Sequence, residues 1–355
     1  MIFLLYNYIY IMVRYAYVYS QEACDYKLIH ILKMQLTIGK YISKYMDVLE
    51  ISSLTVDIVK KYDVICIDHY AINENWLCES NIYTYLNVIS ECKNICILTR
   101  DLHEWTFYKT PLLRNEFNGK NTYNGPVHVP QNKIDIGYMK LKKIMSLYNI
   151  KYIISIYDCE EFVRLTNYIG CKSYVLSLHI DTNIFKKLNI NRDIDILIYG
   201  ADYYKIYPLR NKIKNIVKTM NIKYHIIEPL SGFDKKKCDK GLAMLLNRSW
   251  LTLCTGSVFN YLVLKYFEAS ACGSVVIGNM PKQGEEIWGN NYINISYDWS
   301  DEQIKHTILN ALSDKAKLQY ISTTMSDKIK KYYNYEEYSK KLVKICDSIA
   351  SSEKM

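Results

Sequence analysis

Short apolar segments alternate with longer amphipathic segments along almost the whole chain, and this alternation constrains the fold more than any other feature. The apolar segments are rich in Ile, Val, Leu and Tyr, as in strands that are buried on both faces. Parallel strands need a long crossover, usually a helix, between them. The sequence therefore predicts an α/β fold in which helices cover both faces of parallel sheets.

The alternation runs in two series. In the first series, strands are expected at residues 14–20, 47–52, 63–68, 94–99, 152–156 and 173–177. In the second series, strands are expected at 195–200, 223–227, 250–254, 274–277 and 292–295, with helices at 207–220 and 261–272. Helices at 301–313, 317–332 and 335–350 end the chain, and residues 115–133, in which Asn, Gly and Pro cluster, are expected to form a surface loop.

Two series of this kind fit two doubly wound, Rossmann-like domains, and a length of 355 residues suffices for both. We expect an N-terminal domain in residues 1–185, a second domain in 186–334 and a C-terminal helix in 335–355. Doubly wound sheets bind ligands where strands end and helices begin. Functional side chains are therefore expected at those strand ends, in a cleft between the two domains.

The formal net charge of +9 is spread along the chain, with its densest clusters at residues 142–143 and 235–237. No run of five basic residues occurs, so a solvated, mildly basic surface is the plain explanation, although such a surface also attracts phosphates. The aromatic residues follow alternating core patterns rather than basic ribbons. No nucleic-acid partner is expected.

The 11 cysteines include no Cys-x-x-Cys pair, and Cys66, Cys96 and Cys254 lie inside apolar strands. This usage is typical of a reducing compartment and predicts a cytoplasmic protein.

The N-terminal segment up to Tyr19 is apolar, but Asn7 and Arg14 interrupt it, and its Tyr, Ile and Val content favours a strand over a spanning helix. Residues 1–12 are expected as a loose extension, with Met12 as an alternative start. No stable membrane span is expected, and at most a weak association with a membrane.

One charge interrupts an otherwise apolar helix-to-strand unit at residues 265–278. Glu268 lies in the expected helix, Gly273 stands where a helix ends in the left-handed conformation, and the next strand follows at once. A carboxylate beside Phe267 is costly to bury unless it has a partner. Glu268 either binds a ligand or only stabilises the start of its helix.

The second series resembles the donor domain of GT-B fold glycosyltransferases, of the retaining, group-1 type that uses nucleotide sugars. The resemblance rests on Glu268-Ala-Ser-Ala-Cys-Gly273 before a Val-Val strand, on the glycine-ended strand at Tyr199-Gly200, and on the basic helix start with Arg210. The linker at residues 179–185, His-Ile-Asp-Thr-Asn-Ile-Phe, is similar to the crossover between the two domains of that fold.

The resemblance implies two domains that face across a cleft, with the acceptor on the N-terminal side, the donor on the second domain and the C-terminal helix returning to the first domain. It implies transfer of a sugar from a nucleotide-sugar donor to an acceptor, which the sequence leaves open as a glycan, protein, lipid or small molecule. No cofactor and no metal are expected.

Within this resemblance, Glu268 holds the two vicinal hydroxyls of the ribose, because a carboxylate accepts two hydrogen bonds. Thr255, Gly256 and Ser257 follow a strand and open the next helix, where free backbone amides can receive a phosphate. The other reading of these three residues is an ordinary turn.

The leaving diphosphate carries the largest charge that such an enzyme must stabilise, and in a metal-free site Lys and Arg are the available groups. Arg210 and Lys205, which follow Gly200, are the candidates that the resemblance places at the diphosphate. The alternative is that both are surface charges of the helix 207–220. Lys265 is a third candidate, or else it forms a solvated ion pair with Glu268, three residues later.

The chain departs from the family at Asn260. Many retaining members carry a glutamate at this position, eight residues before the one matched by Glu268, near the sugar of the donor. Asn260 can hydrogen-bond a sugar hydroxyl but carries no charge. The departure leaves open whether the stereochemistry is retaining and whether the protein is catalytically active.

In the first series, Asp101 and His103 follow a strand directly, in the segment Thr-Arg-Asp-Leu-His-Glu-Trp at residues 99–105. His103 is a candidate general base for the acceptor proton, and Asp101 could orient it. The alternative is that Asp101 caps a helix and His103 lies at the surface. Asp68 and His69 form a similar pair at the end of the preceding strand.

Asp193-Ile-Asp195 has the Asp-x-Asp form of some metal-dependent glycosyltransferases, but here it begins a buried strand, and we expect no metal there. The sequence contains no zinc template, no Gly-x-Gly-x-x-Gly fingerprint and no phosphate-binding P-loop. Three alternatives to the transferase remain: a sugar-nucleotide epimerase of the same fold, an inactive binding protein of that fold, and a nucleic-acid-binding or base-glucosylating protein.

Overall fold

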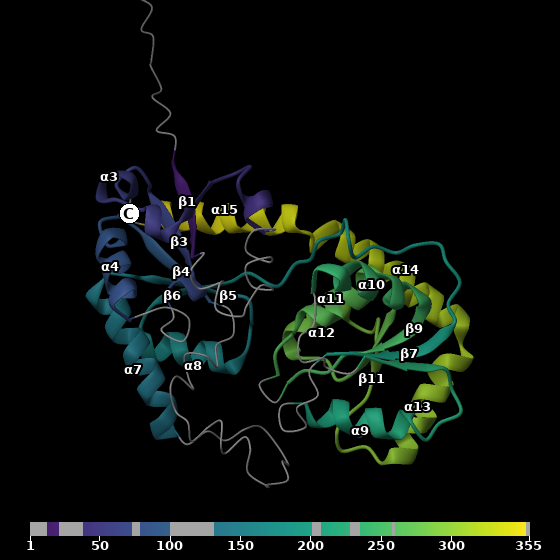
Figure 1. The fold of residues 1–355 in the computed structure, drawn as a ribbon. Coiled ribbons are helices and arrows are strands. Elements are labelled where there is room, and N and C mark those ends of the chain that lie inside the picture. The colour runs from purple at the N-terminus through teal and green to yellow at the C-terminus, as the bar shows by residue number, and fades with distance from the viewer. Residues whose placement is uncertain are drawn as a thin grey trace, which may run out of the picture. The chain divides into compact units, whose positions relative to one another are not determined.

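A computed structural model describes residues 13–20, 38–72, 79–99, 131–200, 207–227, 235–257 and 260–352 (Figure 1). Contacts divide the chain into two compact units, one of Met1–Thr99, Lys143–Ile154 and Lys340–Met355, the other of Arg100–Lys142 and Ser155–Ser339. These two units do not test the division into domains 1–185, 186–334 and 335–355, which stays a prediction.

The N-terminal sheet has six strands in the order β2-β1-β3-β4-β5-β6. The strands are β1 (Tyr15–Tyr19), β2 (Asp47–Glu50), β3 (Val64–Asp68), β4 (Ile95–Thr99), β5 (Tyr152–Ser155) and β6 (Lys172–Val175). The helices of this part are α3 (Val56–Val59), α4 (Glu79–Ile89), α7 (Gln131–Leu147) and α8 (Glu160–Ile169). Strands β1, β3 and β4 pair in parallel and are almost completely buried, as their unbroken apolar runs predict.

The C-terminal sheet has five strands in the order β11-β10-β9-β7-β8, all paired in parallel. The strands are β7 (Ile194–Ile198), β8 (Tyr224–Ile226), β9 (Ser249–Leu253), β10 (Val275–Gly278) and β11 (Ile293–Asn294). The helices are α9 (Pro208–Val217), α10 (Lys235–Arg248), α11 (Leu264–Ala271), α12 (Lys282–Trp288), α13 (Asp301–Ser313) and α14 (Lys315–Tyr332). Helices α9 and α13 cover one face of this sheet, and α10, α11 and α14 cover the other (Figure 1).

Both sheets reverse their strand order at the same place. Strand β1 lies between β2 and β3, and β7 lies between β8 and β9, so in each sheet the chain first moves to one side and then crosses to the other. The carboxyl ends of the two strands at such a reversal open a crevice, because the helices that follow them lie on opposite faces. In the C-terminal sheet this crevice lies beside the ends of β7 and β9.

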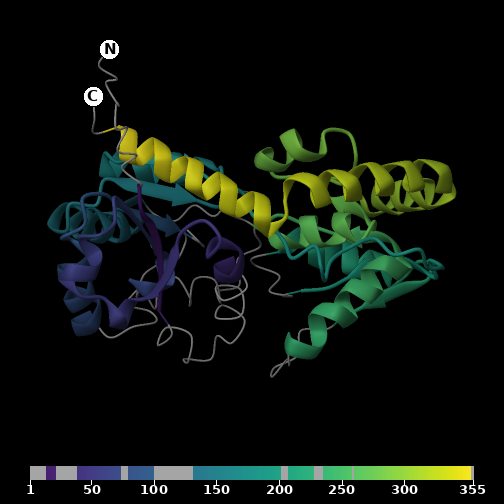
Figure 2. The ribbon, with the colours of Figure 1, turned by 90° about the horizontal axis from the view of Figure 1, so that it is seen from above.

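Helix α15 (Tyr335–Ser351) ends the described chain, and its second half packs on the N-terminal sheet. The Sγ atom of Cys346 lies 3.4 Å from that of Cys66 on β3, and the hydroxyl of Tyr15 on β1 donates to the carboxylate of Asp347. In the view of Figure 2, α15 and α14 follow one another as two distinct helices.

The predicted strands and helices are confirmed except at three places. The helix expected at 261–272 begins only at Leu264, because Asn260 has a positive φ of 56° and Val263 is extended. Helix α7 begins at Gln131, inside the stretch expected as a loop. The short helix α12 was not predicted, since Pro281 precedes it and Gly284 interrupts its apolar pattern.

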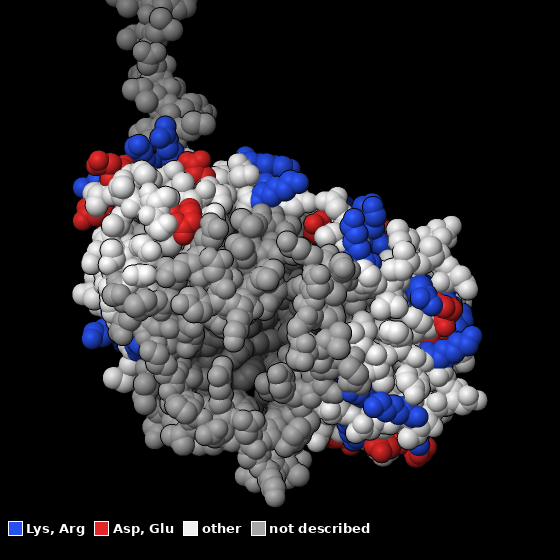
Figure 3. Space-filling view, in the orientation of Figure 1, with Lys and Arg blue, Asp and Glu red and all other residues white. Residues whose placement is uncertain are grey.

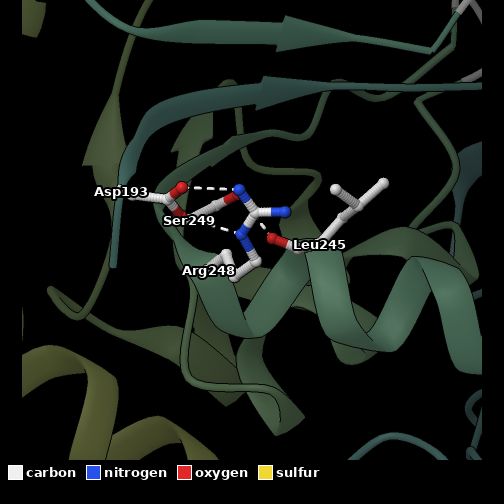
Figure 4. Close-up of polar contacts among 4 residues, drawn as sticks. All are labelled: Asp193, Leu245, Arg248 and Ser249. Atoms are coloured by element: carbon white, nitrogen blue, oxygen red, sulfur yellow. Dashed lines mark hydrogen bonds and ion pairs between the residues drawn. The ribbon is translucent and has the colours of Figure 1, made fainter. Parts of the chain in front are cut away.

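The Asp-x-Asp segment lies at the amino ends of β7 and β9, at the edge away from the crevice. Asp193 accepts two hydrogen bonds from Arg248, at 2.8 Å from Nε and 2.5 Å from Nη2 (Figure 4). Beside this pair, the Ser249 hydroxyl donates to the carbonyl of Leu245 at 2.7 Å. The backbone N–H of Lys223 donates to Asp195 at 2.9 Å. Both carboxylates therefore have protein partners that join strands and helices.

On the face shown in Figure 3, the basic side chains of the described residues lie in separate patches, several of them beside acidic side chains. Within the described part of the chain, no helix combines the length and the apolar composition that crossing a bilayer requires. The N-terminal extension 1–12 lies outside the described residues.

Candidate functional site

Three neighbouring strands of the C-terminal sheet deliver polar groups to one edge. Tyr199 and Gly200 follow β7, Cys254 to Ser257 follow β9, and Asn279 follows β10. Because the strands are parallel, their carboxyl ends lie at the same edge. Most of the predicted donor-binding residues therefore lie near one another: Gly200, Arg210, Thr255, Gly256, Ser257, Lys265 and Glu268.

Gly200 lies against the amino group of Lys265 and the guanidinium of Arg210. Its φ is +96°, and a Cβ at this position would lie 2.7 Å from Nζ of Lys265 and 3.6 Å from Nη1 of Arg210. Only glycine combines this conformation with the space for a cation beside the backbone. Two cationic side chains from different helices thus approach the same point after β7.

Arg210 lies in the first turn of α9 and is only 3% exposed. Its guanidinium carbon lies 3.8 Å from the centre of the Tyr207 ring. Burial lowers the pKa of the guanidinium, which nevertheless stays charged because arginine begins from a very high value. The alternative in which Arg210 is a surface charge of its helix is wrong.

Lys265 lies in the first turn of α11 and is 7% exposed. Its amino group donates to the carbonyl of Tyr199 and lies 4.3 Å from the centre of the Tyr199 ring. Burial, followed by the nearby charge of Arg210, lowers the pKa of this lysine to about 7. The alternative of a solvated ion pair with Glu268 is therefore wrong, since the amino group is buried.

Glu268 is half-buried on α11, one turn after Lys265, and accepts a hydrogen bond of 2.8 Å from the hydroxyl of Tyr199. Burial, and then the charge of Glu268, raises the pKa of the Tyr199 hydroxyl. Tyr199 therefore stays protonated and fixes one carboxylate oxygen. No sequence pattern predicts this role, because the two residues are distant in the chain and only the fold joins them.

The segment after β9 is held by the end of β10. The backbone N–H of Gly256 donates to Oδ1 of Asn279 at 3.1 Å, so this amide already has a partner. A Cβ on Gly278 would lie 1.9 Å from the carbonyl oxygen of Cys254, which fixes how closely the two strands approach. The hydroxyl of Thr255 is buried and has no hydrogen-bond partner among the described residues.

Asn260 stands between β9 and α11, is exposed, and has a positive φ of 56°. Asparagine adopts this left-handed conformation more readily than most residues. Because the helix begins only at Leu264, Asn260 lies in the loop that precedes it rather than on the helix.

The glycine of the Glu-Ala-Ser-Ala-Cys-Gly motif has a structural task. Gly273 has a φ of +78° just after α11, and a Cβ there would lie 2.8 Å from Oγ of Ser322 and 3.0 Å from Nη2 of Arg192. A basic side chain at this end also complements the helix dipole. The motif thus runs from Glu268 in the middle of α11 to Gly273 at the end of the helix, where α14 packs against α11.

The corresponding edge of the N-terminal sheet carries an acid and a histidine. Asp68 and His69 end β3 and are fully buried, and the hydroxyl of Tyr17 on β1 donates to Asp68 at 2.7 Å. Ser20, which follows β1, is also fully buried. The predicted residues Asp101, His103 and Lys205 lie outside the described residues.

Among the described residues, no group of three or more His, Cys, Asp or Glu side chains is placed to hold a metal ion. The C-terminal edge instead carries two buried cationic side chains beside Gly200. In a medium of low polarity, such charges act strongly on an anion, since little water screens them. The arrangement suits a ligand with concentrated negative charge, such as a phosphate.

No family model and no curated protein sequence matches this chain. Two doubly wound parallel sheets define an α/β protein with two Rossmann-like halves. Solved structures make the class more specific, and all of those cited below match over nearly the whole chain.

A sucrose-phosphate synthase from Thermosynechococcus elongatus has a TM-score of 0.54 and 10% identity over 96% of this chain and 100% of its own. HepE from Anabaena, in complex with UDP and glucose, has a TM-score of 0.55 and 11% identity over 95% and 100%. A glycosyltransferase from Rickettsia africae has a TM-score of 0.53 and 11% identity over 96% and 99%. The chain has the GT-B fold of these proteins, which confirms the predicted fold class.

Proposed function

We propose that this protein is a glycosyltransferase that moves a sugar from a nucleotide-sugar donor to an acceptor, with the donor bound at the carboxyl ends of β7 and β9. The observation that carries the proposal is the approach of two buried cationic side chains, Arg210 and Lys265, to Gly200. Burying such charges is costly, so a protein that retains them gains from an anionic ligand. HepE, of the same fold, has been solved with UDP-glucose.

In this proposal, Arg210 contacts the diphosphate and stabilises its charge as the bond to the sugar breaks. Glu268, fixed by Tyr199, accepts hydrogen bonds from the ribose hydroxyls. The buried hydroxyl of Thr255 offers a donor beside Gly256. Lys205, which lies outside the described residues, is a further candidate for the diphosphate.

We propose that the reaction needs no metal ion, because Arg210 and Lys265 supply the positive charge that a divalent cation supplies elsewhere. The expected product retains the configuration of the donor sugar. The acceptor proton is assigned to His103, oriented by Asp101, or to the leaving diphosphate itself.

An inactive donor-binding protein of the same fold is the second candidate, and Asn260 favours it. An amide at this position can hydrogen-bond a sugar but cannot stabilise positive charge on it. An epimerase that acts on a nucleotide sugar would use the same donor site and is separated from the transferase by its product.

The decisive experiment is donor binding by calorimetry across UDP-glucose, GDP-mannose and ADP-glucose, followed by turnover of any donor that binds. We expect one donor to bind. The Arg210→Ala substitution should weaken the binding of that donor about 10- to 100-fold, the range for a hydrogen bond to a charged group. Lys212→Ala in the same helix is the matched control, because its amino group donates to the carbonyls of Tyr297 and Trp299 instead.

The outcomes separate the candidates. Binding with transfer or slow hydrolysis of the donor, in the presence of a chelator, supports the metal-independent transferase. Binding without turnover supports the inactive protein, and a changed sugar on the intact nucleotide identifies an epimerase. The proposal would be contradicted if none of the donors bound to the protein.

A further inference from the structure

We propose that Lys265 takes up a proton when the diphosphate of the donor binds beside Gly200, so that donor affinity falls as the pH rises above neutrality. The inference rests on the donor site proposed above and assigns to that site a sensitivity to pH. It concerns the lysine in the first turn of α11, which is buried together with the neighbouring guanidinium.

The geometry leaves the amino group of Lys265 little room and few partners. It donates to the Tyr199 carbonyl, lies over the Tyr199 ring at 4.3 Å, and lies 2.7 Å from the place where a Cβ on residue 200 would be. A carbonyl and an aromatic ring attract a cation only weakly, compared with a carboxylate. Without an anionic ligand, these surroundings therefore stabilise the charged form of Lys265 only weakly.

Among the described residues, several groups that titrate or carry charge act on this amino group or lie beside it. They follow β7 and β9 or lie on α9 and on α11 itself: Tyr199, Cys254, Arg210, Tyr266 and Glu268. Arg210 disfavours a second positive charge nearby, while the charge of Glu268 favours it less strongly than burial opposes it. Burial raises the pKa values of Cys254, Tyr199 and Tyr266, so these three groups stay protonated near neutrality.

Among the described residues at this edge, Lys265 is thus a group whose charge changes in the neutral range. Its pKa of about 7 means that the amino group is mostly neutral at pH 8. A diphosphate beside Gly200 brings negative charge close to Nζ and raises this pKa again, because an opposite charge favours the protonated form. Binding must then draw a proton from the buffer, in proportion to the charge that Lys265 gains.

The alternative explanation is purely structural: Lys265 only holds the backbone of Tyr199 in place. That role needs a hydrogen-bond donor but no change of charge, so it predicts no exchange of protons on binding. The two explanations therefore differ in the number of protons taken up, which calorimetry measures directly.

The test is titration of the whole protein with UDP-glucose at pH 8, in two buffers of low and high ionisation enthalpy. The pyrophosphate diester of this donor does not titrate near neutrality, so any proton that is taken up binds to the protein. If UDP-glucose does not bind, GDP-mannose and ADP-glucose are used in the same way. We expect uptake of close to one proton, and an affinity that falls by up to about tenfold per pH unit between pH 7.5 and 8.5.

Lys265→Met and Lys265→Gln both remove the titrating group, and the second keeps a side-chain donor for the Tyr199 carbonyl. We expect both variants to bind the donor more weakly at pH 7 and with no proton uptake. Lys218→Met is the matched control, because Lys218 is exposed at the end of α9, and it should behave as the unaltered protein does.

Donor binding without proton uptake by the unaltered protein would overturn the inference and leave the proposed function standing. Proton uptake that persists in both Lys265 variants would overturn it as well, since another group would then be responsible. Failure of every donor to bind would overturn both the proposed function and this inference.

Discussion

The two sheets carry the same kind of tyrosine–acid pair at their strand reversals, with different neighbouring side chains. In the N-terminal sheet, the hydroxyl of Tyr17 donates to Asp68 at 2.7 Å, and both residues are completely buried. In the C-terminal sheet, the hydroxyl of Tyr199 donates to Glu268 at 2.8 Å, and the carboxylate is half-buried beside Lys265 and Arg210.

The comparison indicates that the strand topology decides where a ligand can bind, and that the side chains at that position decide which kind of ligand fits. Each reversal opens a crevice at the carboxyl ends of adjacent strands. The carboxyl edge of the N-terminal sheet carries a buried acid and a buried histidine, and that of the C-terminal sheet carries two buried basic side chains beside Gly200. In our proposal only the second edge binds a diphosphate, and the four predictions below test that contrast.

We expect the largest effect at Gly278, where β9 and β10 approach each other closely at the carboxyl edge of the C-terminal sheet. Gly278→Ala should lower the free energy of unfolding by about 4 kcal/mol or prevent folding, since its Cβ would lie 1.9 Å from the Cys254 carbonyl oxygen. Gly170→Ala, at the end of α8, is the matched control, because its φ is also positive, at +78°, but no atom of the described residues lies within 4 Å of the added Cβ. It should cost only about 1 kcal/mol. Equal costs in urea denaturation would contradict the steric account.

Lys265 should make the stability of the protein depend on pH. Its pKa is lower in the folded protein than in the unfolded chain, so the unfolded chain binds more protons between pH 7 and pH 10, and stability must rise with pH in that range. The slope from this one group is at most about 1.4 kcal/mol per pH unit. Lys265→Met should flatten the dependence measured by denaturation at pH 7, 8 and 9, and an unchanged slope would show that Lys265 is not the source.

The tyrosine–acid pairs allow one substitution to be compared at both edges. Tyr17→Phe removes a donor from a fully buried carboxylate and should cost about 2 kcal/mol of stability, the range for a hydrogen bond to a charged group. Donor affinity should be unchanged, because the proposed diphosphate site lies in the other sheet. A loss of donor affinity without a loss of stability would reverse the roles assigned to the two edges.

Tyr199→Phe should have the smallest effect on stability, about 1 kcal/mol, because water can partly replace the lost donor at the half-buried carboxylate. It should weaken donor binding about fivefold, since Glu268 loses the hydrogen bond that fixes its orientation. Calorimetry with the donor identified above measures this, and unaltered affinity would mean that Glu268 does not contact the ribose.

The fold was largely predictable because its determinants are local. Unbroken apolar runs predict buried parallel strands, and the observed strands β3, β4 and β9 lie within one residue of their expected bounds, while β7 ends two residues before its expected end. The short helix α12 was missed because Pro281 and Gly284 obscure its pattern. The start of α11 was misplaced because the positive φ of Asn260 cannot be inferred from its apolar neighbours.

The site was predictable only in outline. The family resemblance, together with the charge of Glu268 in an apolar helix-to-strand unit, singled out Gly200, Arg210, Lys265 and Glu268 as candidates. Their partners could not be identified, because contacts such as Tyr199 with Glu268 join positions far apart in the chain.

The sequence by itself therefore determined the two doubly wound sheets and the segments in which the candidate residues lie, since both follow from local hydrophobic patterns and strand ends. The tertiary structure decided the surroundings of those residues. Packing against Tyr199 and Arg210 buries Lys265 and brings its pKa near neutrality, and the same packing turns Tyr199 toward Glu268. Burial and distance set these properties, and neither is fixed until the strands and helices are assembled.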